Sequence, residues 1–412
     1  MTPPVFRLIF FVRETYPTFR PDVEVLFAEE LPSRGHQIDF VMQAGRDTDR
    51  LGQQIWHGQT VWVGATDCGG GFLSRLHRQW LGIRHDIRVF MRIRAAQYEA
   101  VQVRDKFVIA AIVALAARRR GIKFIYWLSF PEPESQLARA RAGTARYPLM
   151  NVVRGKVFGW LLYRLILPRC DHAFVQSEQM RRDLAERGID PAKLTPVPMG
   201  VAKADVRSAG GRSGVVKPDA FLTLAYLGTL DAQRRLEVLL EMLALLRQQG
   251  HKVRMLMVGG GDDDQDRLRL ERSAEHFGVL RDLEITGFLP RELALARVES
   301  ADICLSPFFP TPVLRSTSPT KLVEYLALGC PVVANDHPEQ RRVLKDSRAG
   351  VCVPWGARYF ARGVAWLAAR GPTVRQQMGE SGRQWVLAHR TYGTIAADLE
   401  QKYLRILAAP HA

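Results

Sequence analysis

Cysteine is scarce in this sequence, and the few cysteines are dispersed. Five occur among 412 residues (Cys68, Cys170, Cys304, Cys330, Cys352), and none has the C-x-x-C spacing of a redox or zinc motif. An odd, scattered set argues against a disulfide framework and against a structural zinc site. We therefore expect a protein of the reducing cytosol.

Long apolar runs are also missing. The longest, residues 107–117, is well short of the roughly 20 residues that a membrane-spanning helix requires. The run at residues 5–12 is interrupted by Arg7, and no small-residue cleavage pattern follows it, so it does not resemble a signal peptide. We expect a protein that is soluble or lies on a membrane surface without crossing it.

Negative charge is in the minority. The sequence has 58 Lys and Arg against 42 Asp and Glu, which gives a net charge of +16. Such a surface attracts phosphate-rich partners: nucleic acid, anionic lipid or a diphosphate substrate. No nucleic-acid-binding motif accompanies the charge, so we expect no nucleic-acid partner.

One stretch, residues 316–333, organises the rest of the chain. It reads STSPTKLVEYLALGCPVV and follows an apolar run at 301–307 that predicts a buried strand. A helix with apolar residues at helical spacing is expected next, closed by Gly329 and Pro331, and another strand begins at Val332. A Ser/Thr-rich loop therefore leads into the start of a helix between two strands.

Such a loop suits a phosphate, because a helix start offers free backbone N–H groups and the positive end of a dipole. Lys321 in the first turn adds a full charge, and Glu324 one turn later can accept hydrogen bonds from sugar hydroxyls. A capped helix with a solvated Lys–Glu pair explains the same residues equally well.

The segment SPTKLVEYLALGCPVVAND resembles the donor-site motif of the retaining GT-B glycosyltransferases, in the large family that includes sucrose synthases and many bacterial polysaccharide enzymes. Its form is closest to the branch that builds exopolysaccharide, capsule or O-antigen. Members often have two glutamates separated by seven residues; Glu324 matches the second, and Ser316 stands where the first would fall.

This resemblance implies the fold: α/β, with two Rossmann-like doubly wound domains facing a cleft and a carboxy-terminal helix that crosses back to the first domain. It also implies no metal and no cofactor, since the nucleotide-sugar is a substrate. The length suits two domains of roughly 150–200 residues each. We predict an acceptor-binding, membrane-facing domain at 1–205, a Gly/Ser-rich linker at 206–219, a donor domain at 220–390 and the crossover helix at 391–412.

The donor residues are assigned by register with the family. Arg235 would grip the donor diphosphate, to which arginine is suited by its bidentate geometry. Gly287 permits close approach of the nucleotide base, and Phe288 packs on it. With Arg235, Lys321 and Glu324 as the catalytic group, the expected donor-binding residues are Gly228, Thr229, Arg234, Gly287, Phe288, Leu289, Ser316, Thr317, Ser318 and Thr320.

The first half of the chain offers acceptor candidates. The loop at 13–21 follows the first expected strand, and open α/β sheets bind ligands at the carboxyl ends of their strands. We assign Arg13, Glu14 and Arg20 to the acceptor or diphosphate side, with Glu132 added by the family resemblance. A solvated charged loop explains the first three equally well. Many relatives carry a histidine near Glu132, but this stretch has none, so no general base is assigned.

Residues 137–170 mix cations with aromatic and aliphatic side chains. This is the pattern of a helix that lies in a membrane interface, where each basic residue near an anionic leaflet contributes about 1 kcal/mol. The alternative is a core-packed helix with solvated arginines. We favour the membrane surface because the aromatic residues cluster between cations: Arg139, Arg141, Arg146, Arg154, Lys156, Arg164 and Arg169.

These observations predict a transferase that moves a sugar from a nucleotide-sugar to a membrane-associated, polyprenyl-diphosphate-linked acceptor with retention of configuration. It would work at the inner face of the cell membrane in surface polysaccharide assembly. Arg235 and Lys321 would stabilise the negative charge of the departing diphosphate. One alternative is a catalytically silent membrane-surface partner or regulator of the same fold, motivated by Ser316 and the absent histidine; another is a nucleotide-sugar epimerase.

Overall fold

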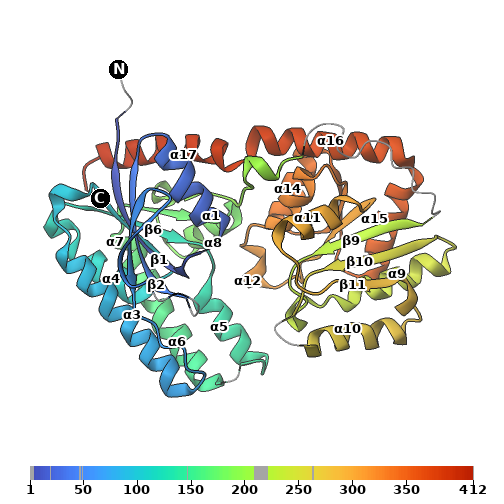
Figure 1. The fold of residues 1–412 in the computed structure, drawn as a ribbon, viewed down its shortest axis with the longest axis horizontal. Coiled ribbons are helices and arrows are strands. Elements are labelled where there is room, and N and C mark those ends of the chain that lie inside the picture. Colours follow the sequence, from blue (N-terminus) through green and yellow to red (C-terminus); the bar gives the residue numbers. More distant parts are fainter. Residues whose placement is uncertain are drawn as a thin grey trace. The chain divides into compact units, whose positions relative to one another are not determined.

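The computed structural model describes residues 4–18, 20–45, 48, 50–145, 147–207, 221–261 and 264–411. Two compact units are present, one made of Met1–Pro198 and Tyr392–Ala412, the other of Met199–Thr391. Figure 1 shows that each unit has helices around a central sheet. The linker expected at 206–219 lies outside the described residues except for its first two.

The sheet of the first unit has eight strands in the order β3-β4-β2-β1-β5-β6-β7-β8. All neighbours pair in parallel except β3, which pairs antiparallel with β4 at one edge. The strands are β1 (Arg7–Tyr16), β2 (Gln37–Ala44), β3 (Gly52–Trp56), β4 (Gln59–Gly64), β5 (Ala100–Arg104), β6 (Lys123–Leu128), β7 (His172–Val175) and β8 (Leu194–Pro196).

Helices cover both faces of this sheet, so its central strands are apolar on both sides. In β1, Leu8 and Phe10 belong to one core cluster, whereas Ile9 and Phe11 belong to the other, because successive side chains point to opposite faces. The covering elements are α1 (Pro21–Val23), η1 (Glu24–Glu30), α2 (Leu31–Ser33), α3 (Phe72–Arg92), α4 (Phe107–Ala116), α5 (Glu132–Arg141), α6 (Pro148–Trp160), η4 (Leu161–Ile166), α7 (Leu167–Arg169) and α8 (Glu178–Glu186).

The carboxy-terminal helix α17 (Tyr392–Ala408) belongs to the first unit, as the resemblance implies. Tyr403 is buried in that unit's core, and its hydroxyl hydrogen-bonds to Gln102 of β5. Glu400 accepts hydrogen bonds from Arg34 and His36 at 3.2 and 3.0 Å. These contacts fix the end of the chain onto its amino-terminal third.

The second unit has a six-stranded parallel sheet in the order β11-β10-β9-β12-β13-β14. The chain begins at β9 in the middle, winds to one edge, then returns to β12 and winds to the other, which is the doubly wound arrangement. The strands are β9 (Leu222–Leu227), β10 (Val253–Val258), β11 (Leu283–Ile285), β12 (Ile303–Ser306), β13 (Val332–Asn335) and β14 (Gly350–Val353).

Helices again cover both faces. They are α9 (Glu237–Gln248), α10 (Asp264–His276), α11 (Arg291–Glu299), α12 (Pro312–Arg315), α13 (Thr320–Ala327), α14 (Pro338–Ser347), α15 (Ala357–Ala369) and α16 (Gly371–His389). Residues 316–333 therefore form a loop, α13 and the start of β13, and the apolar run at 301–307 before them contains β12, in the predicted order. Both α/β units of the expected fold are present.

Candidate functional site

The candidate donor site lies where β9 and β12 end. These two strands are neighbours at the point where the strand order reverses, and open parallel sheets bind ligands outside the carboxyl ends of strands at such a point. Gly228 follows β9 with a φ of 137°, and a Cβ at this position would collide with Cε of Lys321. Glycine is therefore required at position 228 for two reasons, its backbone angle and the close approach of the lysine.

Lys321 lies in the first turn of α13 and reaches back to β9. Its ammonium donates to the hydroxyl of Tyr226 at 3.1 Å and lies 4.9 Å from the centre of that ring. Burial, followed by the charge of Arg234, lowers the pKa of Lys321 to about 7. A bound anion would favour the charged form of this lysine, because negative charge nearby raises the pKa of an amine.

Two arginines follow β9. Arg234 donates from Nε to the hydroxyl of Thr229 at 2.6 Å and to Asp231 at 2.9 Å. Arg235 has a φ of 53°, in the left-handed region that non-glycine residues rarely adopt, and such backbone strain is concentrated at functional sites. Its guanidinium lies 5.6 Å from the ring centre of Phe309, which follows β12. Within the described residues Arg235 makes no ion pair, so its charge is available to an anion.

The loop before α13 is held by its own side chains. Ser316, Thr317 and Ser318 are all buried. The Thr317 hydroxyl donates to the carbonyl of Leu314 at 2.7 Å, and the Ser318 hydroxyl accepts from the Met199 N–H at 3.0 Å. No side chain caps the start of α13 at Thr320, so the first N–H groups of that helix can bind a phosphate.

Glu324 is buried, and Arg291, at the start of α11, donates to its Oε1 at 2.9 Å. Arg291 also donates to Asp205 at 2.8 Å. A carboxylate has about four acceptor sites, so this ion pair orients Glu324 and leaves it capacity for sugar hydroxyls. Sequence reasoning missed Arg291; its position directly after the expected base-binding segment was the available signal.

The expected base-binding segment follows β11. Gly287 has a φ of 72°, and Phe288 is 88% exposed. Leu289, in contrast, packs against the core of the second unit. A ring that the fold leaves so exposed beside the carboxyl end of a strand is free to stack on a ligand.

The acceptor candidates of the first unit gather around a pocket of about 560 Å³ at the carboxyl ends of β1, β5 and β6. Arg13, Glu14 and Arg20 line it, and Glu132 pairs with Arg13 at 3.4 Å. β1 and β5 are also the strands at which the order of this sheet reverses. The other lining residues are Thr15, Pro17, Thr18, Asp105, Ser129 and Phe130.

Two further charged residues of this pocket region were not predicted. Arg104 is fully buried and pairs with Asp22 at 2.7 Å and with Glu14 at 3.3 Å. Asp105 has a φ of 51°, accepts from the backbone N–H and hydroxyl of Ser129, and has its pKa raised to about 6 by burial. The signal in the sequence was a pair of opposite charges, Arg104 and Asp105, at the end of an apolar strand.

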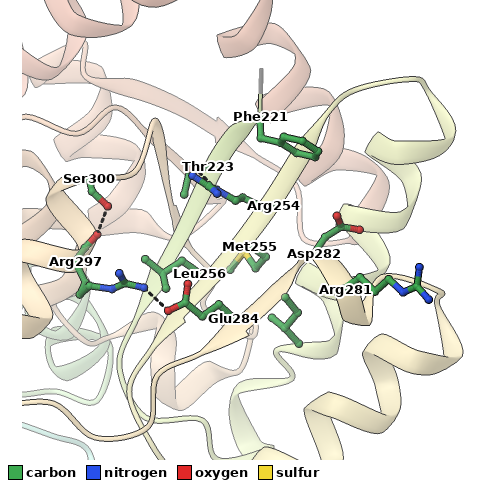
Figure 2. A pocket seen from close by; sticks show the side chains of 11 residues that line it. Phe221, Thr223, Arg254, Met255, Leu256, Arg281, Asp282, Glu284, Arg297 and Ser300 are labelled. Atoms are coloured by element: carbon green, nitrogen blue, oxygen red, sulfur yellow. Dashed lines mark hydrogen bonds and ion pairs between the residues drawn. The ribbon is translucent and has the colours of Figure 1, made fainter. Parts of the chain in front are cut away.

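A separate pocket of about 470 Å³ lies at the amino ends of β9, β10 and β11 (Figure 2). Arg254 there donates to the Thr223 hydroxyl at 2.9 Å, and Arg297 forms an ion pair with Glu284. These charges already have partners, and the pocket is at the end of the sheet opposite to Lys321. It is therefore a poor candidate for the donor site.

The described part of the chain has no group of three or more His, Cys, Asp and Glu side chains that could hold a metal ion. No helix among the same residues is long and apolar enough to span a bilayer. The expectations of no metal and no cofactor stay predictions.

Two protein families match the chain, one in each half. The family described as "Glycosyltransferase Family 4" matches residues 25–204, and the family described as "Glycosyl transferases group 1" matches residues 222–370. The second match contains β9, Lys321 and Glu324, and the first contains Glu132.

Individual relatives match over part of their length. The phosphatidyl-myo-inositol mannosyltransferase of Mycobacterium leprae is 28% identical over 208 residues, 50% of this chain and 52% of the relative. The putative colanic acid biosynthesis glycosyltransferase WcaL of Salmonella typhimurium is 27% identical over 193 residues, 47% of this chain and 46% of the relative. This chain thus spans about half the length of the curated relatives that it matches.

Solved structures match over nearly the whole chain. Sucrose-phosphate synthase from Thermosynechococcus elongatus has a TM-score of 0.73 at 16% identity, covering 98% of this chain and all of the other. Anabaena HepE in complex with UDP and glucose has a TM-score of 0.67 at 13% identity, covering 97% and 100%. At these identities the likeness establishes the fold. The chain therefore has the GT-B fold, and glycosyltransferase family models match a part of each of its halves.

Proposed function

We propose that this protein transfers a sugar from a nucleotide-sugar to a lipid-linked acceptor with retention of anomeric configuration. A polyprenyl-diphosphate-linked glycan is the acceptor we expect, in surface polysaccharide assembly at the inner face of the cell membrane. One observation carries the proposal: Lys321, Arg234 and Arg235 gather at the carboxyl ends of β9 and β12. Lys321 is buried and lies near the charge of Arg234, which also lowers its pKa, so an anion bound beside the lysine would offset both its burial and this repulsion.

The proposed roles in binding the nucleotide-sugar donor follow from this cluster of cations. Arg235 and Lys321 stabilise the charge that develops on the departing diphosphate, and preorganised groups of this kind commonly contribute most to the rate enhancement of an enzyme. The backbone of the loop at 316–320 and the start of α13 hold the phosphates. Glu324 fixes the ribose, and Phe288 stacks on the base. HepE, which shares the fold, has been solved with UDP and glucose bound.

The proposal of a lipid-linked acceptor has separate support. The name of the Mycobacterium leprae relative specifies a phosphatidylinositol, a lipid, as what it acts on. The pocket lined by Arg13, Glu14 and Arg20 would receive the acceptor, and its cations suit a phosphate-linked one. The family matches favour an enzyme over a silent partner or an epimerase, because both relatives are named as transferases.

The first experiment identifies the donor. Nucleotide-sugars are screened for a rise in melting temperature, since a ligand that binds only the folded state stabilises it. Release of nucleotide from the best candidate is then measured with and without a lipid-linked acceptor. Stimulation by the acceptor supports the proposal, whereas binding with no turnover on any lipid-linked acceptor would indicate the silent partner.

The second experiment tests the charge role. Lys321→Ala should lower nucleotide release by more than about tenfold, because losing one preorganised stabilising group typically costs a hundredfold or more. Lys345→Ala, on the exposed side of α14, is the matched control and should leave the rate unchanged. A smaller loss in Lys321→Ala would refute the proposed role of this lysine.

A further inference from the structure

An apolar stripe on α6 faces solvent. Leu149 is 84% exposed, Val153 60%, Val157 48% and Trp160 61%. Their spacing of four, four and three residues puts them on one side of the helix. The other side is packed: Gly155 is buried, and a Cβ there would lie 2.7 Å from Cγ of Leu137 in α5. The core-packed alternative from the sequence therefore accounts for one side of this helix and leaves the stripe unexplained.

The first turns of α3 present a second apolar group. Phe72, Leu73, Leu76 and Trp80 are between 45% and 78% exposed. The ring of Phe72 lies 5.8 Å from the ring of Tyr147, the residue before α6, so the two apolar groups begin side by side. Figure 1 shows α3 and α6 starting next to each other at one end of the first unit. We call the exposed residues of these two helices the α3–α6 face.

The charge around this face is mostly positive; beside it, Asp67 pairs with His77 of α3 at 2.9 Å. The segments 72–92 and 148–169 contain one acidic residue, Asp86, which is buried and paired with Lys106 at 2.8 Å. They contain nine cations: Arg75, Arg78, Arg84, Arg88, Arg92, Arg154, Lys156, Arg164 and Arg169.

None of these nine cations forms an ion pair with another residue that the structure describes. Some surface arginines elsewhere are paired, as Arg181 is with Glu178 in α8 and Arg267 with Glu271 in α10. The positive charge of the α3–α6 face is therefore left without neutralising partners, next to apolar side chains that a monomer normally buries or scatters.

We propose that the α3–α6 face docks on an anionic phospholipid bilayer. Exposed Trp, Phe and Leu side chains can enter the interface, while flanking cations contact lipid phosphates. A second copy of the chain fits poorly, because a twofold interface would set these cations against the same cations of the partner. This inference rests on the proposed function. If the acceptor is lipid-linked, the α3–α6 face would hold the enzyme on the leaflet that carries the acceptor.

The test is sedimentation of the full chain with vesicles. Wild type should bind phosphatidylcholine vesicles that contain phosphatidylglycerol and bind pure phosphatidylcholine vesicles much more weakly. Lys156→Gln with Arg164→Gln, both exposed, should weaken binding to the anionic vesicles by about fivefold for each lost cation. Leu149→Ser with Trp160→Ser should weaken binding to both kinds of vesicle. Leu280→Ser with Leu293→Ser, exposed apolar residues of the second unit, is the matched control and should not.

The proposal would be overturned if both α3–α6 variants bound vesicles as strongly as wild type, or if the control variant lost as much binding as they do. A dimer in gel filtration that the same substitutions abolish would also overturn it, because the face would then be a self-association surface. Nucleotide-sugar stabilisation is measured in the same variants and should be unchanged. Vesicle binding without any nucleotide-sugar binding would sustain the docking face while the proposed transferase fails.

Discussion

Replacing Lys321 by methionine should make the protein more stable and less able to bind its donor. Methionine keeps much of the lysine's length and apolar contact without its charge. Burial lowers the pKa of Lys321 to about 7 from 10.5. Between these values the unfolded lysine is protonated and the folded one is not, so the unfolded state binds more protons and stability rises with pH.

The size of the effect follows from the same shift. One pKa unit corresponds to about 1.4 kcal/mol, so at pH 7 the buried lysine costs at most about 4 kcal/mol. The cost is greatest below pH 7 and disappears as pH approaches 10.5. Lys321→Met should therefore melt several degrees higher than wild type at pH 7, and the difference should shrink as the pH rises towards 10.

Thermal unfolding at pH 7 and at pH 9.5 measures the difference in melting temperature between Lys321→Met and wild type, with Lys345→Met as an exposed control. In parallel, binding of nucleoside diphosphate to wild type should take up protons, because the anion raises the pKa of Lys321; calorimetry in buffers of different ionisation enthalpy detects the uptake. A variant less stable than wild type at pH 7, or a difference independent of pH, would contradict the reasoning.

The remaining predictions concern the loop, the base and the first unit. Ser318→Ala removes the acceptor of the Met199 N–H and should cost about 1 kcal/mol of stability, read from urea unfolding, with Thr320→Ser as a mild control. Phe288→Ala should weaken nucleotide-sugar binding by about 1–3 kcal/mol, the usual range for base stacking, with no change in the melting temperature of the free protein, because the ring is 88% exposed. Asp105→Asn removes a buried carboxyl whose pKa is raised to about 6; wild-type stability should fall as pH rises through 4 to 6, whereas the variant should lack this slope. Equal slopes in both proteins would show that Asp105 does not titrate in this range.

Local patterns in the sequence predict much of the second unit. Residues 301–333 specify a strand, a loop, a helix and the start of a second strand, because apolar spacing and the terminating Gly329 and Pro331 act over a few residues. The structure has β12, α13 and β13 in these places. The cations expected to bind the diphosphate lie at the ends of β9 and β12, although their catalytic roles stay predictions.

Long-range contacts decided what these patterns leave open. Glu324 is held by Arg291, 33 residues away, and Lys321 is bonded to Tyr226, 95 residues away. Nothing in the local pattern marks Arg104 and Asp105 as buried, but the position of β5 between β1 and β6 buries both. A pKa or an ion pair of this kind depends on which strands become neighbours.

The same division applies to the region that we expect to face a membrane. Composition alone determined that residues 137–170 are cationic and apolar, and it left two interpretations open, a packed helix or an interfacial one. Only the tertiary structure showed that Gly155 faces α5 while Leu149 and Trp160 face solvent. The helical period predicts which residues share one face of the helix, whereas the neighbouring elements determine which face is buried.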